Sequence, residues 1–456
     1  MMNDTELLID ICKREISSNL YNIEIDGIYI YNFIRRYVRE RVASVYNHGS
    51  KYSLPQVSVK EYRVSVLKSL YHLIKFYIRK RRTAILLYSF SRIDVVNGQY
   101  LDKFTDPLID FSKIKDSYII FEQGRNGRHL TPRYHRKNIV YSDFIPWIVA
   151  HMSFPRKKMN AQYHNALLKL EESIENSFPE VDFDRNLIAN NVLSSLMEVK
   201  LYTKIFKWHN VKYFIAPARD GLVNIIPAAK KCGVKVFELQ HGVTYSESFT
   251  YSGYIDPLFS PDYFLSFGKL NSSKCYGTTD DKVVEIGWAF EKYLKHKIVI
   301  QNENCNVMVV SSPAISEQMV SITCSLASQN PNVVFHFRPH PNEQLDAERM
   351  ERLNSFSNIR IDNNLENISV SLMRFDNVIG ENSTVLYEAL SMGKKVGKLH
   401  LEGLIPHYLD EEDRSFFYEI TDFESFTNFI RLPLNSKPSK KIYTEFNPEA
   451  INQLLK

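Results

Sequence analysis

The residues best suited to chemistry lie where short apolar runs end. The run 333–337 leads directly into Arg338, Pro339, His340 and Pro341. Each proline fixes its own φ and favours an extended residue before it, so Arg338 and His340 are predicted to be held rigidly at a strand end. Both side chains can donate hydrogen bonds to phosphate oxygens. The sequence therefore predicts an anion site here, and the alternative is a proline-closed loop with a surface histidine.

A second signal lies further along the same half of the chain, where an apolar run ends in Gly380 and small polar residues follow. Such residues predict a helix start, whose backbone N–H groups suit phosphate. We expect Glu381 to bind a sugar or ribose hydroxyl. The predicted donor-site residues of this segment are Glu381, Asn382, Ser383, Thr384 and Glu388. The same residue types would also serve as ordinary helix caps.

Two strand ends in the preceding half carry further polar residues. Asp220 stands before Gly221, and His241 stands before Gly242, which permits close backbone approach. Asp220 is our first candidate for a general base and His241 the second, although Asp220 would serve equally as a helix cap. The further residues predicted to line a cleft are Arg219, Gly242, Ser311 and Ser312.

These motifs resemble those of bacterial surface-polysaccharide glycosyltransferases of the GT-B fold. That group includes sialyl- and Kdo-transferases and teichoic-acid glycerophosphotransferases. The resemblance covers residues 205–400 and is carried by His340-Pro341 and the segment 380–390. In the sialyl- and Kdo-type members a His-Pro pair and a Ser/Thr-rich segment bind the donor nucleotide, which implies His340, Ser383 and Thr384 here. Their acidic-acidic-Gly motif supplies the base, and its counterpart here begins with an arginine, Arg219.

The resemblance implies a cytoplasmic glycosyltransferase that moves a sugar from a nucleotide-sugar donor. The acceptor would be a growing surface polysaccharide or lipid-linked glycan of the capsule or O-antigen (lipopolysaccharide) type. The donor is a substrate, with a CMP-sugar as one candidate, and neither a cofactor nor a metal is expected. Arg338, His340 and the helix start near Ser383 would stabilise the charge that grows on the leaving phosphate.

Other functions remain open. One alternative is a UDP-sugar 2-epimerase-like enzyme, and another is a non-enzymatic nucleotide-sugar-binding component of a polysaccharide assembly complex. Asp182 and Asp184 match the DxD pattern of metal-dependent transferases, but they follow Pro179 without a leading apolar strand. The chain contains no GxSxG, P-loop or GxGxxG motif, so serine hydrolases, P-loop NTPases and classical dehydrogenases lack their marks.

Alternating strands and helices must position these residues. We predict strands at 84–88, 118–121, 138–141, 212–216, 234–239, 263–267 and 283–286, then at 307–310, 333–338, 359–361, 377–379 and 395–398. Helices are expected at 28–46, 57–78, 161–208, 222–232, 316–328, 343–355, 383–392 and 450–455. This order predicts an α/β protein with two Rossmann-like, doubly wound domains facing a cleft, after an N-terminal helical segment.

The predicted organisation has five parts. They are a helical segment (1–80), an acceptor domain (81–291), a linker (292–304), a nucleotide-sugar-binding domain (305–435) and a tail with a helix (436–456).

Composition narrows the class of partner. The 456 residues carry a formal net charge of only +5, which does not argue for nucleic acid. Five scattered cysteines without metal or redox spacing predict a reduced, intracellular chain. Basic residues gather at 79–82 and 125–137, and we expect either a solvated face or a peripheral contact with anionic lipid or a lipid-diphosphate acceptor.

Overall fold

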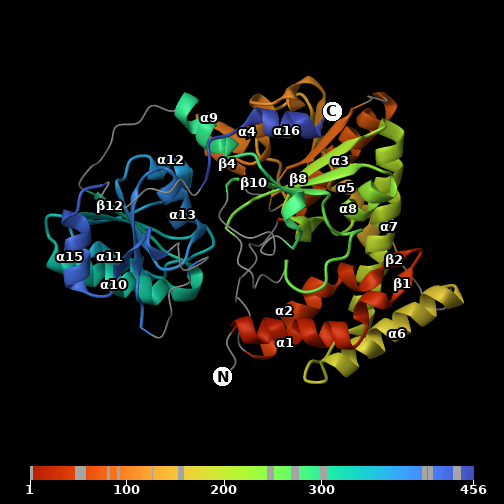
Figure 1. The fold of residues 1–456 in the computed structure, drawn as a ribbon, viewed down its shortest axis with the longest axis horizontal. Helices are drawn as coiled ribbons and strands as arrows, with labels where there is room; N and C mark the ends of the chain where they lie inside the picture. The colour runs from red at the N-terminus through yellow and green to blue at the C-terminus, as the bar shows by residue number, and fades with distance from the viewer. Residues whose placement is uncertain are drawn as a thin grey trace.

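Two separate parallel β-sheets organise the protein, which we describe from a computed structural model (Figure 1). The described residues are 4–46, 58–79, 83–89, 93–125, 127–152, 159–243, 251–268, 277–297, 306–402, 408, 414–434 and 443–456.

The first sheet has seven parallel strands in the order β11-β10-β9-β8-β3-β6-β7. Its strands are β3 (Ile85–Tyr88), β6 (Tyr118–Glu122), β7 (Ile139–Tyr141), β8 (Tyr213–Pro217), β9 (Lys235–Leu239), β10 (Tyr263–Ser266) and β11 (Val283–Glu285). The chain starts at β3, moves outward through β6 and β7, and then returns to the other side of β3. The strand order therefore reverses between β3 and β8, as in a Rossmann fold.

The second sheet repeats this plan with six parallel strands in the order β14-β13-β12-β15-β16-β17. Its strands are β12 (Asn306–Val310), β13 (Val334–Arg338), β14 (Ile359–Ile361), β15 (Asn377–Gly380), β16 (Lys395–Leu399) and β17 (Tyr418–Ile420). Here the order reverses between β12 and β15. The predicted fold class, two doubly wound domains, is confirmed.

Helices cover both faces of each sheet, because side chains alternate between the faces of a strand. Leu86 and Tyr88 of β3 pack with α6 (Ala161–Ser177), α7 (Arg185–His209) and α8 (Ile225–Lys231). Val307 and Val309 of β12 pack with α10 (Ser316–Gln329), α11 (Ala347–Asn354) and α15 (Phe423–Arg431).

One apolar core is shared by the two domains. It joins Leu87 of β3 to Val310 of β12 through the helices between the sheets. Those helices are α4 (Thr105–Asp110), α9 (Ala289–Lys297), α12 (Ile368–Leu372), α13 (Thr384–Ser391) and α16 (Pro448–Leu454). The domains are therefore packed against each other as well as joined in sequence.

The N-terminal part is less helical than predicted. Its elements are α1 (Asp4–Ser17), β1 (Glu24–Ile25), β2 (Ile28–Tyr29), α2 (Arg35–Val45) and α3 (Val59–Arg79). The predicted helix 28–46 is wrong in its first turns, because Ile28 pairs with Ile25 in a hairpin. The fully buried Arg39 forms an ion pair with Glu15 at 2.6 Å and ties α2 to α1.

The predicted helix 161–208 is two helices, α6 and α7. Asp184 caps α7, with its Oδ1 accepting from the N–H groups of Asn186 (2.8 Å) and Leu187 (3.1 Å). A carboxylate used as a cap satisfies helix N–H groups that would otherwise lack partners, which explains the DxD match without a metal. Several short elements were not predicted, among them the hairpin β4 (Ile93–Val96)–β5 (Gln99–Asp102) and α5 (Phe144–Ala150). The helices α4, α9, α12 and α15 and the strand β17 were not predicted either.

The linker and the tail differ from the expected division. Residues 292–297 of the predicted linker belong to α9, and 298–305 lie outside the described residues. The tail returns to the first domain, where α16 lies beside α4 (Figure 1). The N–H of Thr444 donates to the carbonyl of Phe267 (2.8 Å), and the N–H of Asn447 donates to that of Ile286 (2.7 Å).

The C-terminal tail passes close to Gly287, so a substitution there should strongly destabilise the protein. Its φ is +74°, and an added Cβ would overlap the backbone carbonyl of Glu445. Gly287→Ala should cost about 3 kcal/mol or more, since a left-handed backbone and a backbone clash both oppose it. Gly393→Ala is the control, because Gly393 has φ +76° and open space around it. It should cost only about 1–2 kcal/mol. Equal thermal unfolding midpoints for the two variants would contradict the described crossing.

Candidate functional site

Three motifs meet at the carboxyl edge of the second sheet. Val310 of β12 pairs with Arg338 of β13 on one side and with Gly380 of β15 on the other, so all three strands end at one level. The loops that follow carry Ser311 and Ser312, His340, and the residues 381–384. This edge includes the reversal of strand order between β12 and β15, which is where doubly wound sheets bind ligands.

The loop that carries His340 is held by a residue that the sequence analysis did not single out. Glu343 accepts the His340 N–H at 2.9 Å with one carboxylate oxygen and the Ser311 hydroxyl at 2.9 Å with the other. The Nδ1 of His340 accepts the N–H of Asn342 at 3.1 Å. A neutral His340 ring therefore carries its proton on Nε2, where it is a hydrogen-bond donor.

Arg338 is placed differently from what we predicted. It is only 6% exposed, and its guanidinium donates to Asp362 (2.7 Å), to Ser371 (2.9 Å) and to the carbonyl of Glu366 (2.5 Å). These contacts direct the guanidinium into the domain. We therefore revise its predicted role from direct donor contact to bracing the segments beside the His340 loop.

The predicted helix start is present as α13. Ser383 is its N-cap, with Oγ accepting the N–H of Val385 at 3.2 Å, and Thr384 is the first helical residue. Asn382 and Glu381 lie between this cap and β15, and Glu381 is half-buried. Burial raises the pKa of Glu381, while the charge of Lys398 opposes that rise.

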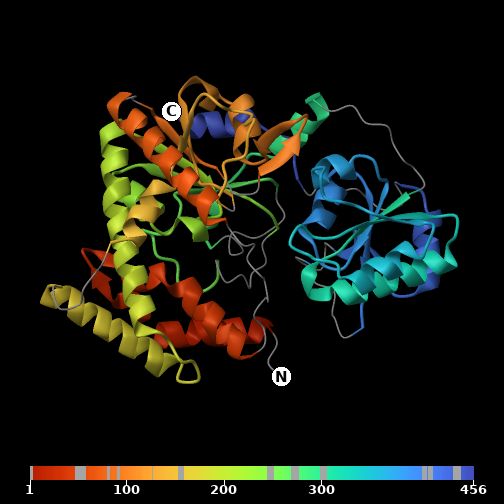
Figure 2. The ribbon, with the colours of Figure 1, turned by 180° about the vertical axis from the view of Figure 1, so that it is seen from behind.

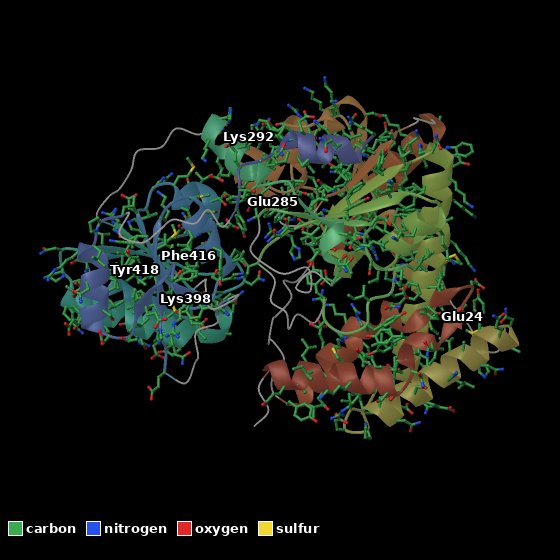
Figure 3. The ribbon with its side chains drawn as sticks, in the orientation of Figure 1. Glu24, Glu285, Lys292, Lys398, Phe416 and Tyr418 are labelled. Atoms are coloured by element: carbon green, nitrogen blue, oxygen red, sulfur yellow. The ribbon has the colours of Figure 1, made fainter. Side chains whose placement is uncertain are left out.

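Lys398 brings a buried positive charge to this edge. It is fully buried and pairs with Gly380 across β15 and β16. Its Nζ lies 4.2 Å from the ring centre of Tyr408, 4.7 Å from Phe417 and 5.5 Å from Tyr387. Figure 3 shows Lys398 within the second domain. A cation surrounded by aromatic faces is stabilised where water is excluded. The sequence predicted the strand that carries Lys398, but no local pattern indicated the three aromatic rings around its side chain.

The first domain approaches this edge through the loop after β9. A Cβ on Gly242 would lie 3.5 Å from Cγ2 and 3.6 Å from Oγ1 of Thr384. Gln240 fixes the loop, since its Nε2 donates to the carbonyl of Gly242 (2.9 Å) and its Oε1 accepts the N–H of Phe267 (2.7 Å). The structure thus brings the His241-Gly242 pair to the α13 start, although the two motifs were predicted on separate domains.

Arg219 and Asp220, at the end of β8, are used within the first domain. Arg219 is 7% exposed and forms an ion pair with Glu238 at 2.5 Å, so the prediction that it lines a cleft is wrong. Asp220 forms an ion pair with Arg36 of α2 at 2.6 Å. Of our two candidate bases, His241 is the one whose neighbour, Gly242, lies near the α13 start.

Glu388, predicted to bind the donor, instead connects the domains. It is buried and forms an ion pair with Lys103, which follows β5 in the first domain, at 3.0 Å. Its other carboxylate oxygen accepts the Ser369 hydroxyl at 2.9 Å. A buried carboxylate with both oxygens occupied in this way holds α13 against the first domain.

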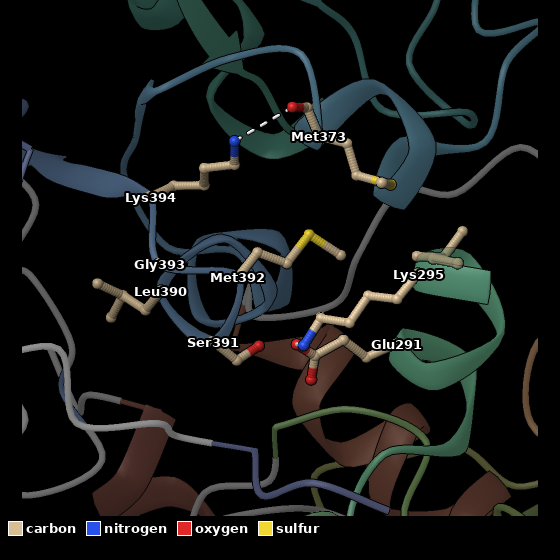
Figure 4. A pocket seen from close by; sticks show the side chains of 9 residues that line it. Glu291, Lys295, Met373, Leu390, Ser391, Met392, Gly393 and Lys394 are labelled. Atoms are coloured by element: carbon tan, nitrogen blue, oxygen red, sulfur yellow. Dashed lines mark hydrogen bonds and ion pairs between the residues drawn. The ribbon is translucent and has the colours of Figure 1, made fainter. Parts of the chain in front are cut away.

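A cavity of about 320 Å³ lies at the opposite end of α13 (Figure 4). It is lined by Glu291 and Lys295 of α9, by Met373, and by the turn 391–394. None of the predicted site residues lines it. The candidate site and this cavity therefore lie at the two ends of one helix.

Among the described residues, no group of three or more His, Cys, Asp or Glu side chains is arranged to hold a metal ion. Residues 410–413, an acidic run in the sequence, lie outside the described part of the chain. That the reaction needs no metal stays a prediction.

The contrast between Arg338 and His340 can be tested directly. His340→Ala removes an exposed donor and should weaken nucleotide binding roughly ten- to hundredfold, the value of one hydrogen bond to a charged group, without loss of stability. Arg338→Ala should also lower the free energy of unfolding by about 1.5–3 kcal/mol, because it leaves buried acceptors without their partner. Nucleotide titration and thermal melting measure both effects.

The control for these two variants is Arg360→Ala, since Arg360 is an exposed arginine on β14. It should change neither quantity. An unchanged melting temperature in Arg338→Ala would contradict the bracing role. Unchanged nucleotide affinity in His340→Ala would exclude His340 from the site.

Comparisons with known proteins found similar solved structures and no match in sequence. No protein-family model matches the chain, and no curated protein matches its sequence. Among solved structures, it is similar to UDP-GlcNAc 2-epimerases from Methanocaldococcus jannaschii (10% identity, 81% of this chain and 97% of that one, TM-score 0.49) and Neisseria meningitidis (12%, 81% and 96%, 0.43). It is also similar to a glycosyltransferase from Rickettsia africae (14%, 82% and 96%, 0.43).

Proposed function

We propose that this protein is an enzyme that binds a nucleotide-activated sugar at the carboxyl edge of the second sheet and transfers the sugar to a glycan acceptor. The observation that carries the proposal is the meeting of Ser311, the His340 loop and the α13 start at one level, across the reversal of strand order. A histidine donor beside a helix N-terminus suits a phosphate or diphosphate.

The leaving nucleotide would be stabilised by groups that are already in place. His340 offers an Nε2 donor, the first turn of α13 offers backbone N–H groups, and Lys398 adds a fixed charge behind Gly380. Donors that need no rearrangement stabilise charge as it develops in the transition state. Glu381 would accept a hydroxyl hydrogen bond from the ribose or the sugar.

His241 is our proposed base for the acceptor hydroxyl. The loop that carries it reaches the α13 start, whereas Asp220 is bound to Arg36. A neutral imidazole has a ring nitrogen that can accept a proton from a hydroxyl group.

The acceptor class rests on the resemblance described above. We propose a growing surface polysaccharide or a lipid-linked glycan of the capsule or O-antigen type, handled in the cytoplasm. A nucleotide-sugar-binding protein without catalysis would share the donor site but show no turnover.

Epimerisation of the sugar nucleotide is a second candidate. The observation that favours it is that Gly242 lies so near Thr384 that an added Cβ would make van der Waals contact, since a narrow interface suits a reaction on the donor alone. Two of the solved structures named above are themselves described as UDP-GlcNAc 2-epimerases.

An assay with and without acceptor separates these functions. Screening CMP, UDP, GDP, dTDP and CDP-glycerol for thermal stabilisation identifies the nucleotide, because saturation at 100 times Kd stabilises the native state by about 2.7 kcal/mol. The matching sugar nucleotides are then incubated with the protein and followed by NMR. Transfer predicts release of nucleotide that requires a glycan acceptor. If the donor alone is converted into its 2-epimer, the protein is an epimerase and not a transferase. If no donor is converted with or without acceptor, the protein only binds the sugar nucleotide.

The choice of base predicts unequal effects of two substitutions. His241→Asn should slow transfer about a hundredfold or more while nucleotide affinity is retained, because it removes only the proton acceptor. Asp220→Asn should leave transfer within a few-fold of the parent and cost at most about 1 kcal/mol of stability, as expected for a partly exposed ion pair. If Asp220→Asn slows transfer more than His241→Asn does, Asp220 is the base instead.

A further inference from the structure

Helix α3 carries a row of apolar side chains that face solvent. The row recurs at spacings of three and four residues, which places it on one side of a helix. Its members are Val64, Leu67, Tyr71, Ile74 and Ile78, between 45% and 75% exposed. Ser65, Val66, Ser69 and Phe76 form the buried side. Figure 2 shows α3, in orange-red, on the outside of the first domain.

Aromatic side chains continue this surface onto the next helix. Tyr77 of α3 stacks on Trp208 of α7 with ring centres 4.6 Å apart, and both remain exposed. The indole Nε1 donates to the carbonyl of Tyr77 at 3.2 Å. A contiguous exposed apolar surface marks an interaction site, and tyrosine with tryptophan is typical of a boundary between water and lipid.

Positive charge surrounds the row. Lys60, Arg63, Lys68 and Lys75 are exposed on the same helix, while its single acid, Glu61, forms an ion pair with Arg128 at 2.5 Å. Long basic side chains can lie along apolar surface and still present their charge to headgroups. The surface is thus apolar in its centre and cationic around it.

A small basic cavity adjoins this helix. It measures about 140 Å³ and is lined in part by His72 and Lys75 of α3 and by Arg136 and Lys137, which precede β7. Burial lowers the pKa of His72, and Lys75 and Lys68 act in the same direction. The charge of the cavity at neutral pH therefore comes from the lysines and the arginine, which suit a phosphate group.

We propose that α3 is a docking surface for a membrane whose headgroups are anionic phospholipids. The apolar row would enter the boundary between headgroups and acyl chains, and the basic residues with the cavity would contact headgroup phosphates. Charge complementarity selects this partner over a second copy of the chain, which would present the same cationic surface. No described helix is long and apolar enough to cross a membrane, so the contact is peripheral.

The sequence predicted basic contacts at 79–82 and at 125–137, and residues 80–82 lie outside the described part of the chain. Of the basic stretch 125–137, Arg133 is buried in ion pairs with Glu122 at 2.7 Å and with Asp106, so it is unable to reach a headgroup. Arg128 is the partner of Glu61. Only the end of that stretch, Arg136 and Lys137, joins the surface of α3.

Flotation of the full chain with vesicles tests the proposal. The chain should bind phosphatidylcholine vesicles that contain phosphatidylglycerol, bind pure phosphatidylcholine at least tenfold less, and lose binding as salt is raised. Replacing Leu67, Tyr71 and Ile74 together by serine should weaken binding at least tenfold. Lys68→Glu with Lys75→Glu should weaken it about 25-fold or more, at about fivefold for each charge lost.

Leu365→Ser is the matched control, since Leu365 is 76% exposed on the second domain, and it should bind vesicles as the parent does. Nucleotide-induced stabilisation should be the same in all these variants, which separates this proposal from the proposed function. If the triple variant fails to fold, the charge-reversal pair decides. Absence of binding to the anionic vesicles, or equal binding by the variants, would overturn the proposal. A dimer in solution that the triple variant converts to monomer, without vesicle binding, would assign α3 to a second copy instead.

Discussion

The candidate site depends on the parallel pairing of β12 with β13 on one side and β15 on the other. That pairing sets Arg338, Val310 and Gly380 at one level, so the loops that follow leave the sheet together. It also favours glycine at position 380, because a Cβ there would lie 3.0 Å from the carbonyl oxygen of Val310 and 3.3 Å from Leu386, which is a crowded contact. The register of the strands thus determines the geometry of the candidate site.

Charged residues that are bound within the second domain fix the positions of the loops at the candidate site. Glu343 holds the His340 loop to Ser311, and Arg338 binds the segments that follow β14. Lys398 is enclosed by three aromatic rings. Burying a charge is costly unless it has partners, so each of these residues fixes its surroundings in one arrangement. These contacts hold the His340 loop and its surroundings in place.

Coupling between the domains runs along α13. Its start meets the loop of Gly242, its middle is bound to Lys103 through Glu388, and its far end borders the cavity with α9. The shared apolar core and the returning tail add contacts on the same side. Moving the two domains apart would therefore require α13 to separate from the first domain.

The sequence by itself determined the strands, the two-sheet fold and the positions of the His340 loop and the α13 start. These depend on neighbours along the chain: apolar runs of strand length, prolines that restrict φ, and small polar residues that cap a helix. Only the tertiary structure decided which charged residues face a ligand. Arg338 and Arg219 both follow apolar strands, yet each is buried against a carboxylate from elsewhere, Asp362 or Glu238. Glu388 finds its partner 285 residues away. Such partners are chosen by the approach of distant segments, which local spacing does not record.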